Sequence, residues 1–572
     1  NYNVTVGDEA GTAITTGDHN VALGYSALVT EDAHGYNTAI GGRSLFTLNA
    51  GAEGYNTAVG YDSGRLMTTG TSNTLIGASS GDAITTGSNN VALGTDALGL
   101  NTTGDANTAI GEDSLKANTT ASNNTAVGRR AMLSNTTGTD NVAMGHNALD
   151  ANTTADNNTA IGHDALSANT TGTRNTSVGS LALSTATTAD NNTAVGYDAL
   201  GDVTTGANNT AMGDRAGDKL TTGAANTAIG ASALGTSTTA DNNTAIGYAA
   251  LDANTTGHSN TGIGKSALAA NTTGSNHTAV GLGALDANTT SAANSAFGRD
   301  SLGANTTGDD NVALGYAALF SNTTADNNTG VGYKALYANT TGAGNTALGM
   351  RALTANTTAS NNISIGKDSM YANTTGASNV AVGLSALQNN TTASNNTAVG
   401  YTALFANTTG AGNAAVGTLA LDANTTGNNG TAMGYGALSA NTTAANNTAF
   451  GYLALQVNTT GHENTMVGGI SGDAITTGSV NTGVGYNSLG ATTTGASNVA
   501  VGYDALASNT TASSNTAVGR SALLLNTTGT QNTAVGAYAL DSNTTASSNT
   551  SVGYGALEAN TTGTGNNAFG AI

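Results

Sequence analysis

The side chains best suited to hold a metal ion or to move protons are seven histidines. They are His19, His34, His146, His163, His258, His277 and His462. Only His146 and His163 share a position in adjacent copies of the repeat described below, where a stacked structure would bring them together. Two imidazoles can contribute to a metal site, but no third ligand type recurs beside them. We therefore expect the histidines to be solvated surface residues.

Four aspartates introduce the tripeptide Asp-Asn-Asn, which groups oxygen atoms of the kind that Ca²⁺ prefers. They are Asp156, Asp190, Asp241 and Asp326. Other copies of the repeat have serine at the same position, and the nonapeptide calcium motif is absent. We expect these aspartates to make turn hydrogen bonds, with weak calcium binding as the alternative.

Motifs for enzymatic chemistry are missing. The chain has no Ser-His-Asp order, no H-E-x-x-H, no phosphate-binding loop and no dinucleotide-binding glycine motif after a strand. An active site needs residues that differ from their neighbours, whereas this chain repeats itself. We predict that the protein is not an enzyme, has no catalytic residues and needs no cofactor.

The composition narrows the possible partners. A formal net charge of −21 with only 14 Lys and Arg disfavours nucleic acid, because phosphate neutralisation needs a basic stripe. The absence of cysteine excludes disulfides and thiolate metal sites. No apolar run approaches the roughly 20 residues of a membrane span, so we expect none in this chain. Both ends fall within a repeat, as expected for part of a longer or processed protein.

The element that must position all these side chains is a 17-residue repeat, represented by residues 243–259, NTAIGYAALDANTTGHS. Its fifth residue, Gly247, recurs at every 17th residue from Gly60 to Gly570, and three earlier glycines bring the total to 34 copies. The single irregularity is a 19-residue step within residues 42–60. A fixed short period of this kind predicts a solenoid.

Asn, Thr and Gly are poor helix formers, which excludes helical repeats. Residues 396–399 read as a short strand that ends at Gly400, and residues 407–409 as a second strand. We predict an all-β parallel β-solenoid, or β-roll, of about 34 coils of 17 residues. It forms a single continuous domain over residues 1–572, with an irregular coil at 42–60 and no separate globular domain.

Large apolar residues recur at positions 4 and 9 of the repeat, and we expect both to face the interior. In five repeats position 9 is Gly, and position 12 then changes from Asn to an apolar residue. The pairs are Gly11 and Ile14, Gly64 and Met67, Gly81 and Ile84, Gly217 and Leu220, and Gly472 and Ile475. Positions 9 and 12 therefore face one interior of fixed volume. Asn at position 12 is expected to form an amide ladder rather than to carry a glycan.

Tyrosine is frequent at position 6, and position 10 carries occasional aromatics such as Phe320 and Tyr337. We expect these rings to pack along the coil edge or between subunits, with contact to glycan or a partner fibre as the alternative. Two apolar residues per coil bury little area against the cost of ordering 17 residues. We therefore predict a homo-oligomer, most simply a homotrimer. Ice binding needs two outward ranks of threonine, which the adjacent threonines at positions 13 and 14 do not supply.

The run N-T-A-V-G-Y-x-A-L-x-x-N-T-T-G, present at residues 396–410, resembles the repeats of bacterial and phage tail-fibre-domain proteins. Its N-x-A-(V/I)-G core is similar to the coils of trimeric autotransporter adhesin heads. The resemblance covers nearly the whole chain, and it implies a left-handed, trimeric β-roll. It further implies an extracellular or cell-surface fibre or adhesin shaft, a passive rod that mediates attachment. Two alternatives are a phage tail-fibre shaft for host recognition on the virion and a self-assembling filament subunit that joins end to end. A surface glycan or a protein receptor is the possible further partner.

Overall fold

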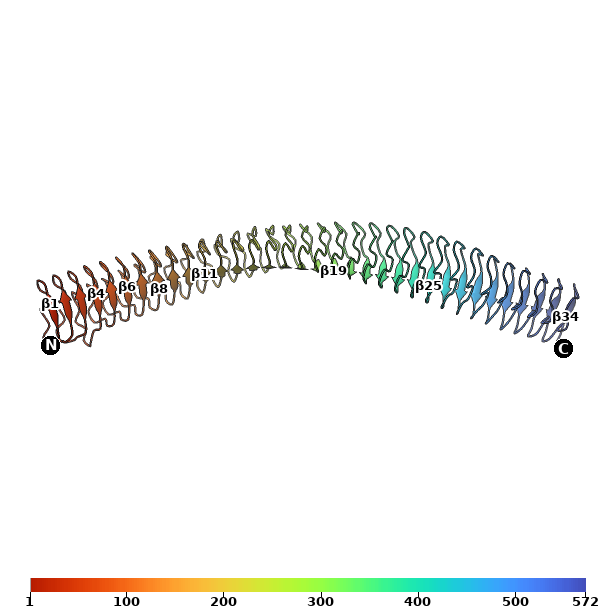
Figure 1. The fold of residues 1–572 in the computed structure, drawn as a ribbon, viewed down its shortest axis with the longest axis horizontal. Coiled ribbons are helices and arrows are strands. Elements are labelled where there is room, and N and C mark those ends of the chain that lie inside the picture. The colour runs from red at the N-terminus through yellow and green to blue at the C-terminus, as the bar shows by residue number, and fades with distance from the viewer. Residues whose placement is uncertain (1) are drawn as a thin grey trace. The chain divides into compact units, whose positions relative to one another are not determined.

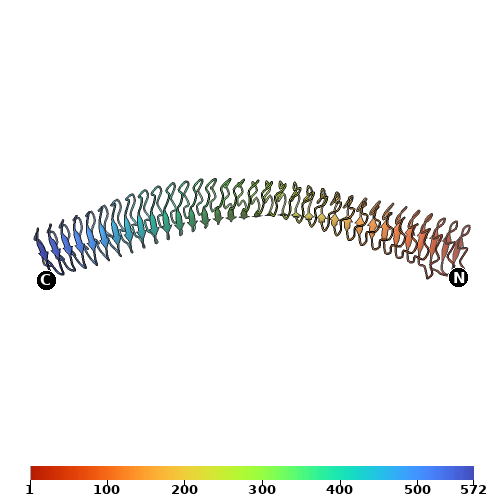
Figure 2. The same ribbon diagram turned by 180° about the vertical axis from the view of Figure 1, so that it is seen from behind.

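The computed structural model describes residues 2–572, which contain 34 strands and no helix. They fall into two compact units, the first ending at Ser291 and the second spanning Ala292–Ile572, and each is described by itself. Each unit is a parallel β-solenoid of 17 coils with one three-residue strand per coil, so the predicted fold class and period are confirmed. The strands of each unit lie side by side (Figures 1 and 2). The single continuous domain over residues 1–572 stays a prediction.

The strands of the first unit are β1 (Val4–Val6), β2 (Val21–Leu23), β3 (Thr38–Ile40), β4 (Thr57–Val59), β5 (Thr74–Ile76), β6 (Val91–Leu93), β7 (Thr108–Ile110), β8 (Thr125–Val127), β9 (Val142–Met144), β10 (Thr159–Ile161), β11 (Thr176–Val178), β12 (Thr193–Val195), β13 (Thr210–Met212), β14 (Thr227–Ile229), β15 (Thr244–Ile246), β16 (Thr261–Ile263) and β17 (Thr278–Val280). Those of the second unit are β18 (Ser295–Phe297), β19 (Val312–Leu314), β20 (Thr329–Val331), β21 (Thr346–Leu348), β22 (Ile363–Ile365), β23 (Val380–Val382), β24 (Thr397–Val399), β25 (Ala414–Val416), β26 (Thr431–Met433), β27 (Thr448–Phe450), β28 (Thr465–Val467), β29 (Thr482–Val484), β30 (Val499–Val501), β31 (Thr516–Val518), β32 (Thr533–Val535), β33 (Thr550–Val552) and β34 (Asn567–Phe569).

Backbone hydrogen bonds tie each coil to both neighbours. In the coil that contains β15, the N–H of Thr244 donates to the carbonyl of Asn260 in the next coil at 2.8 Å. The N–H of Gly247 donates to the carbonyl of Ile229 in the preceding coil at 2.7 Å. Bonds of this kind recur along each unit, and equivalent positions therefore stand above one another in columns, as the register of β15 on β16 shows. Strand spacing makes the 17 coils of one unit roughly 80 Å long.

The assignment of position 4 to the interior is wrong. In β15 the middle residue, Ala245, is fully buried, whereas Thr244 and Ile246 on either side are partly exposed. Successive side chains of a strand point to opposite faces, so a single buried residue in a three-residue strand must be the central one. Position 3 carries small alanine because the coil is narrow. The bulky residue at position 4 lies outside.

Position 9 is the main apolar column, as predicted, and Leu251 is fully buried there. The substitution of position 12 for position 9 is also confirmed: Met67, Ile84, Leu220 and Ile475 are all fully buried. Ile14, in the first coil, is partly exposed. A Cβ added to Gly81 would lie 2.8 Å from the Cδ1 of Ile84, so the two positions compete for one volume.

The invariant glycine follows each strand for a steric reason. Gly247 has a φ of +135°, and a Cβ there would lie 2.6 Å from the carbonyl oxygen of Gly264 in the next coil. Any side chain at this position would collide with the backbone above it. The period is therefore marked by the one residue that lets the coils approach closely.

After this glycine the chain turns through positions 6 to 11. Position 7 and position 9 both adopt the left-handed conformation, with a φ of 53° at Ala249 and at Leu251. The left-handed conformation is strained for leucine, and it persists here because the core holds the buried side chain in place. The second strand predicted at positions 12–14 is wrong: residues 407–409 form a bend instead, although Thr408 N–H still donates to the carbonyl of Thr425 at 2.9 Å.

Two columns of buried asparagine line the interior. At position 12 the amide of Asn271 donates to Asn254 Oδ1 at 2.9 Å, which confirms the predicted ladder. At position 1, which the sequence did not single out, Asn243 Oδ1 accepts from the backbone N–H of Asn260 at 3.0 Å. Asn243 and Asn254 both donate to the carbonyl of Gly257 at 2.9 Å. These amides are buried in the interior, and a buried position-12 amide cannot carry a glycan.

Candidate functional site

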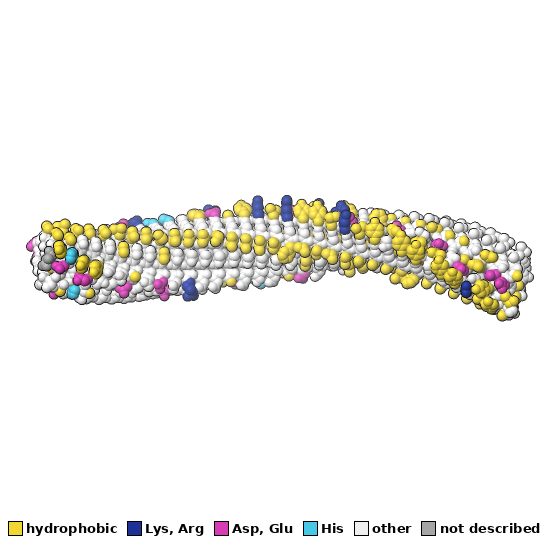
Figure 3. Space-filling model, turned by 60° about the horizontal axis from the view of Figure 1, so that its bottom comes forward, with side chains coloured by type: hydrophobic (Ala, Val, Ile, Leu, Met, Phe, Trp, Pro, Cys, Tyr) yellow, Lys and Arg dark blue, Asp and Glu magenta, His cyan; other side chains and the backbone are white. Residues whose placement is uncertain are grey.

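The feature best placed to meet a partner is the outward face of the strands. Position 2 contributes a rank of half-buried threonines, and position 4 contributes a rank of exposed aliphatic or aromatic side chains. Phe450 at position 4 is 51% exposed, and Met212 is 49% exposed. Rows of hydrophobic side chains follow the surface (Figure 3). The strand face therefore has one outward rank of threonine, at position 2, and not the two that ice binding needs.

Position 6 adds a third exposed rank beside the strands. In many coils it is a tyrosine, and neighbouring rings stack along the column, with centroids 5.5 Å apart between Tyr316 and Tyr333. Tyr486 and Tyr503 stack at 5.6 Å. The predicted packing of aromatics along the coil edge is therefore present. The rings remain about half exposed, so the same column is free to contact a further surface.

Cations accompany the aromatic columns of the second unit. Lys334 Nζ lies 5.0 Å from the ring centroid of Tyr337 and 5.5 Å from that of Tyr333. Arg351 lies 5.3 Å from the ring centroid of Tyr371. In the first unit a different stack runs along position 17, where His19 lies between Tyr2 and Tyr36 with centroids 4.9 and 4.8 Å away.

The four candidate calcium ligands each hydrogen-bond to the preceding coil. Asp156 Oδ1 accepts from the backbone N–H of Thr139 at 2.6 Å. The carboxylates of Asp190, Asp241 and Asp326 accept from the equivalent N–H groups at 2.6 to 2.8 Å. A serine hydroxyl does the same elsewhere, as Ser122 does for Asp105 at 2.9 Å. Within residues 2–572, none of the four lies in a group of three clustered metal-ligating side chains.

The histidines do not all lie on the surface. His277 is 1% exposed and occupies position 1, where its backbone N–H donates to Asn260 Oδ1 at 3.0 Å and its Nε2 lies 2.8 Å from the carbonyl of Ser291. It replaces an asparagine of the buried column, so the expectation of a solvated residue is wrong there. The sequence signal was its place in the repeat. His146 and His163 do stack, with centroids 5.3 Å apart.

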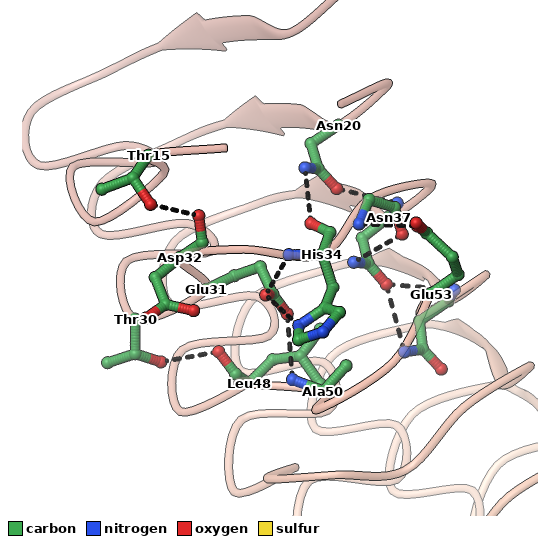
Figure 4. A network of polar contacts seen from close by, with 12 residues as sticks. Thr15, Asn20, Thr30, Glu31, Asp32, His34, Asn37, Leu48, Ala50 and Glu53 are labelled. Carbon is green, nitrogen blue, oxygen red and sulfur yellow. Dashed lines mark hydrogen bonds and ion pairs between the residues drawn. The ribbon is translucent and has the colours of Figure 1, made fainter. Parts of the chain in front are cut away.

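Reasoning from sequence missed a buried carboxylate near the irregular coil (Figure 4). Glu31 occupies position 12, in place of the usual asparagine, and is fully buried. Its Oε1 accepts from the backbone N–H of His34 at 3.1 Å, and its Oε2 accepts from that of Ala50 at 3.1 Å. Glu53, from the inserted segment, accepts from the N–H of Gly35 at 2.9 Å. The glutamates satisfy backbone groups that the 19-residue step displaces.

Several aspartates at position 10 sit partly inside the coil edge. Burial raises the pKa of Asp422 and that of Asp473. Burial also raises the pKa of Asp252, and the negative charge of Asp218 adds to the effect. One carboxylate oxygen of Asp422, Oδ1, is buried without a hydrogen-bond partner. These groups lie at separate coils of a column and do not form a paired acid and base.

No protein-family model matches this chain, and no curated protein matches it significantly. Among residues 2–572 there is no helix with the length and apolar character needed to cross a bilayer. The feature that distinguishes the surface of each unit is its long ranks of partly exposed threonine, aliphatic and aromatic side chains.

Proposed function

We propose that this protein forms the shaft of an extracellular fibre, in which three copies associate through the outward faces of their strands. The observation that carries the proposal is the outward apolar rank at position 4, whose side chains are exposed or partly exposed in every coil of each unit. Soluble monomers rarely leave contiguous apolar patches of this extent in water. A second copy of the same chain, with the same 17-residue period, offers a rank of matching spacing.

The area available in the second unit is large enough for a specific interface. Eight tyrosines at position 6 are each 41–59% exposed: Tyr316, Tyr333, Tyr401, Tyr435, Tyr452, Tyr486, Tyr503 and Tyr554. An aromatic side chain offers about 150–250 Å², so each of them presents roughly 100 Å² and the set roughly 800 Å². A standard interface buries about 800 Å² per partner. The aliphatic rank at position 4 adds to this area.

The role of the fibre is passive projection of an attachment element away from a surface. The resemblance of residues 396–410 to tail-fibre-domain repeats and adhesin heads supports this role, a trimeric state and a location outside the cell. The scattered negative charge supports it too, because net charge keeps long fibres from sticking laterally. A phage tail-fibre shaft uses the same architecture, and structural phage genes beside this one would select that alternative.

The association is tested by measuring the mass of the purified chain in solution. We expect a discrete trimer of the 55.5 kDa chain. The triple variant Met433→Asp, Phe450→Asp and Val467→Asp places charges on the exposed rank of three adjacent coils and should shift the protein toward monomer. The matched control is Thr443→Asp, Thr460→Asp and Thr477→Asp, at the exposed position 14 of the same coils.

A monodisperse wild-type monomer would overturn the association. The apolar rank at position 4 would then be open to water. Equal dissociation of both triple variants would also contradict the proposal, since it would reflect added charge and not the strand face. Protease treatment of intact cells tests the location: a chain that resists cleavage until the cells are lysed would place the protein inside.

A further inference from the structure

Four side chains on adjacent coils of the first unit converge outside β9 and β10. His146 and His163 occupy position 6, and Asn147 and Asp164 occupy position 7 of the same two coils. One nitrogen of each histidine and one oxygen of Asp164 lie within 4.8 Å of one another. His163 Nδ1 is 3.1 Å from Asp164 Oδ2, and Asn147 Nδ2 donates to Asp164 Oδ1 at 3.1 Å.

Two polar atoms of this group have no partner. His146 Nδ1 and Asn147 Oδ1 are both buried and make no hydrogen bond. Burying an unpaired polar atom is costly, so a group with two of them is suited to a ligand that accepts both lone pairs. A cation can accept the lone pairs of both His146 Nδ1 and Asn147 Oδ1, whereas a ligand that is itself a hydrogen-bond acceptor cannot.

The backbone holds the ligands in register. The N–H of Asp164 donates to the carbonyl of His146 at 3.0 Å, and the rings of His146 and His163 are stacked 13° from parallel. The left-handed conformation of Asn147 and Asp164, each with a φ of 54°, directs both side chains from the same point of the turn. Each imidazole ligates through a nitrogen lone pair in its ring plane, so the rings must rotate out of this stack to place one nitrogen each at the roughly 2.0–2.1 Å that a zinc–histidine bond requires.

We propose that His146, His163 and Asp164, with the amide oxygen of Asn147 as a fourth ligand, bind a divalent transition metal of the Zn²⁺ class. Imidazole nitrogens favour Zn²⁺, Ni²⁺ and Cu²⁺, whereas Ca²⁺ takes oxygen ligands only. The bound ion joins two consecutive coils through their side chains and stabilises the stack locally, because it binds the folded state alone. The nearest cation on the same column, Arg129, is paired with Glu112 at 3.3 Å, which limits its repulsion of the ion.

A second group of three, Glu31, Asp32 and His34, serves as an internal comparison. The Glu31 oxygens already accept from the N–H groups of His34 and Ala50, so this group has less capacity for an ion. It lies in the same unit and has a histidine that can be removed in the same way. His258 provides a further control, since it lies outside both groups.

The experiment titrates ZnCl₂ into the full chain after treatment with a chelator, using calorimetry and the thermal unfolding midpoint. We expect one Zn²⁺ per chain and a higher unfolding midpoint. His146→Ala, His163→Ala and Asp164→Asn should each weaken binding by roughly a hundredfold, since even outer-shell partners are worth about ten- to a hundredfold. His34→Ala and His258→Ala should leave affinity and stoichiometry unchanged.

Folding of the variants is secure because position 6 tolerates alanine and serine in other coils, such as Ala78 and Ser180. Substitution with Co²⁺ gives a second measurement, whose visible spectrum reports nitrogen and oxygen ligation. The proposal is overturned if Zn²⁺ does not bind, if His34→Ala abolishes binding while His146→Ala does not, or if Ca²⁺ raises the unfolding midpoint as Zn²⁺ does.

Discussion

The two units are built from the same coil, yet they differ in the columns that the coil leaves variable. At position 12 the second unit has asparagine in 14 of its 16 complete coils, with ten in succession from Asn305 to Asn458. The first unit has asparagine in only eight of 17 coils, and its column is interrupted by Glu31, Ala186, Ser237 and several large apolar residues. The first unit also contains the 19-residue step.

The outer columns differ as well. Position 6 is tyrosine in eight of the 17 coils of the second unit and in four of the 17 coils of the first. The first unit places acids, histidines and cations there instead, among them Glu112, Arg129 and His146. Its 24 Asp and Glu against nine Lys and Arg give a formal charge of −15, compared with −6 for the second unit, which has 11 and five.

The comparison of the two units shows which positions of the coil are fixed by stacking and which can vary. Position 5 and the left-handed turn are constant because each coil must lie directly on the next. Position 12 varies only within a fixed interior volume. Position 6 faces solvent, so its side chains can vary without disturbing the stack and can serve to bind a partner. They are often aromatic in the second unit, and in the first they include the two histidines of the proposed metal site.

The largest expected effect tests whether the interior is the same in both units. Leu251→Ala in the first and Leu421→Ala in the second remove fully buried side chains from equivalent places. Each should lower the free energy of unfolding by about 2–5 kcal/mol. Chemical denaturation measures this cost, and Thr256→Ala, an exposed substitution in the same coil as Leu251, is the control with a loss of less than about 1 kcal/mol. An equal loss for Thr256→Ala would show that burial of the leucine is not the cause.

A smaller effect tests the asparagine columns. Asn424 donates to Asn407 Oδ1 and to the carbonyl of Gly427, and accepts from the amide of Asn441. Asn254 donates to Gly257 and accepts from Asn271, but its preceding neighbour in the column is Ser237. Asn424→Ala therefore loses three hydrogen bonds and Asn254→Ala two. The second-unit variant should be the less stable by about 0.5–1.5 kcal/mol in thermal or chemical unfolding.

Thr256→Ala, an exposed substitution in the same coil as Asn254, serves as the control and should be nearly neutral. Equal losses for the two asparagine variants would mean that continuity of the ladder contributes nothing. A greater loss for Asn254→Ala would reverse the comparison between the units.

The repeat itself determined how much of this could be predicted. The period, the fold class and the buried column at Leu251 follow from residue types at fixed spacing. The pairing of Gly81 at position 9 with Ile84 at position 12 indicates, from the sequence alone, that the two positions share one interior volume. Position 4 was misplaced because a large aliphatic residue is ordinarily a sign of burial, whereas this strand is too short and its coil too narrow to bury more than Ala245.

The site could be predicted less well, since it depends on which neighbours the turn brings together. The pair His146 and His163 was visible from the period, but Asp164 was not recognised as the third ligand. Its carboxylate reaches the imidazoles because position 7 adopts a left-handed conformation, which no residue pattern indicated. His277 and Glu31 could have been found by asking which column each one occupies.

The tyrosine columns give a test that separates the units by association. Tyr435→Ser, Tyr452→Ser and Tyr486→Ser remove exposed rings from the second unit, and Tyr25→Ser, Tyr61→Ser and Tyr197→Ser remove the same number from the first. The second-unit variant should weaken self-association by about 1 kcal/mol or more for each ring at a central contact. The first-unit variant should change it less, because no two tyrosines are neighbours in the position-6 column of that unit. Sedimentation over a concentration series measures both, and an equal effect would remove the distinction.

The smallest expected effect concerns charge at position 10. Burial raises the pKa of Asp422 above its unfolded value of about 3.9. Between the two values the folded state holds the proton more tightly, so this group lowers stability as pH rises through that window and leaves it lower at neutral pH. Asp422→Asn should therefore stabilise the second unit at pH 7 by a few tenths of a kcal/mol, since the group is partly exposed and screened. The gain should vanish below about pH 3.9.

In the first unit, the pKa of Asp252 is raised by burial and also by the negative charge of Asp218. Added salt screens that charge, so it should reduce the stability gained by Asp252→Asn and leave the stability gained by Asp422→Asn unchanged. Thermal unfolding at two ionic strengths distinguishes them, and a gain independent of pH in either variant would show that the charge of the buried carboxylate is not its cause.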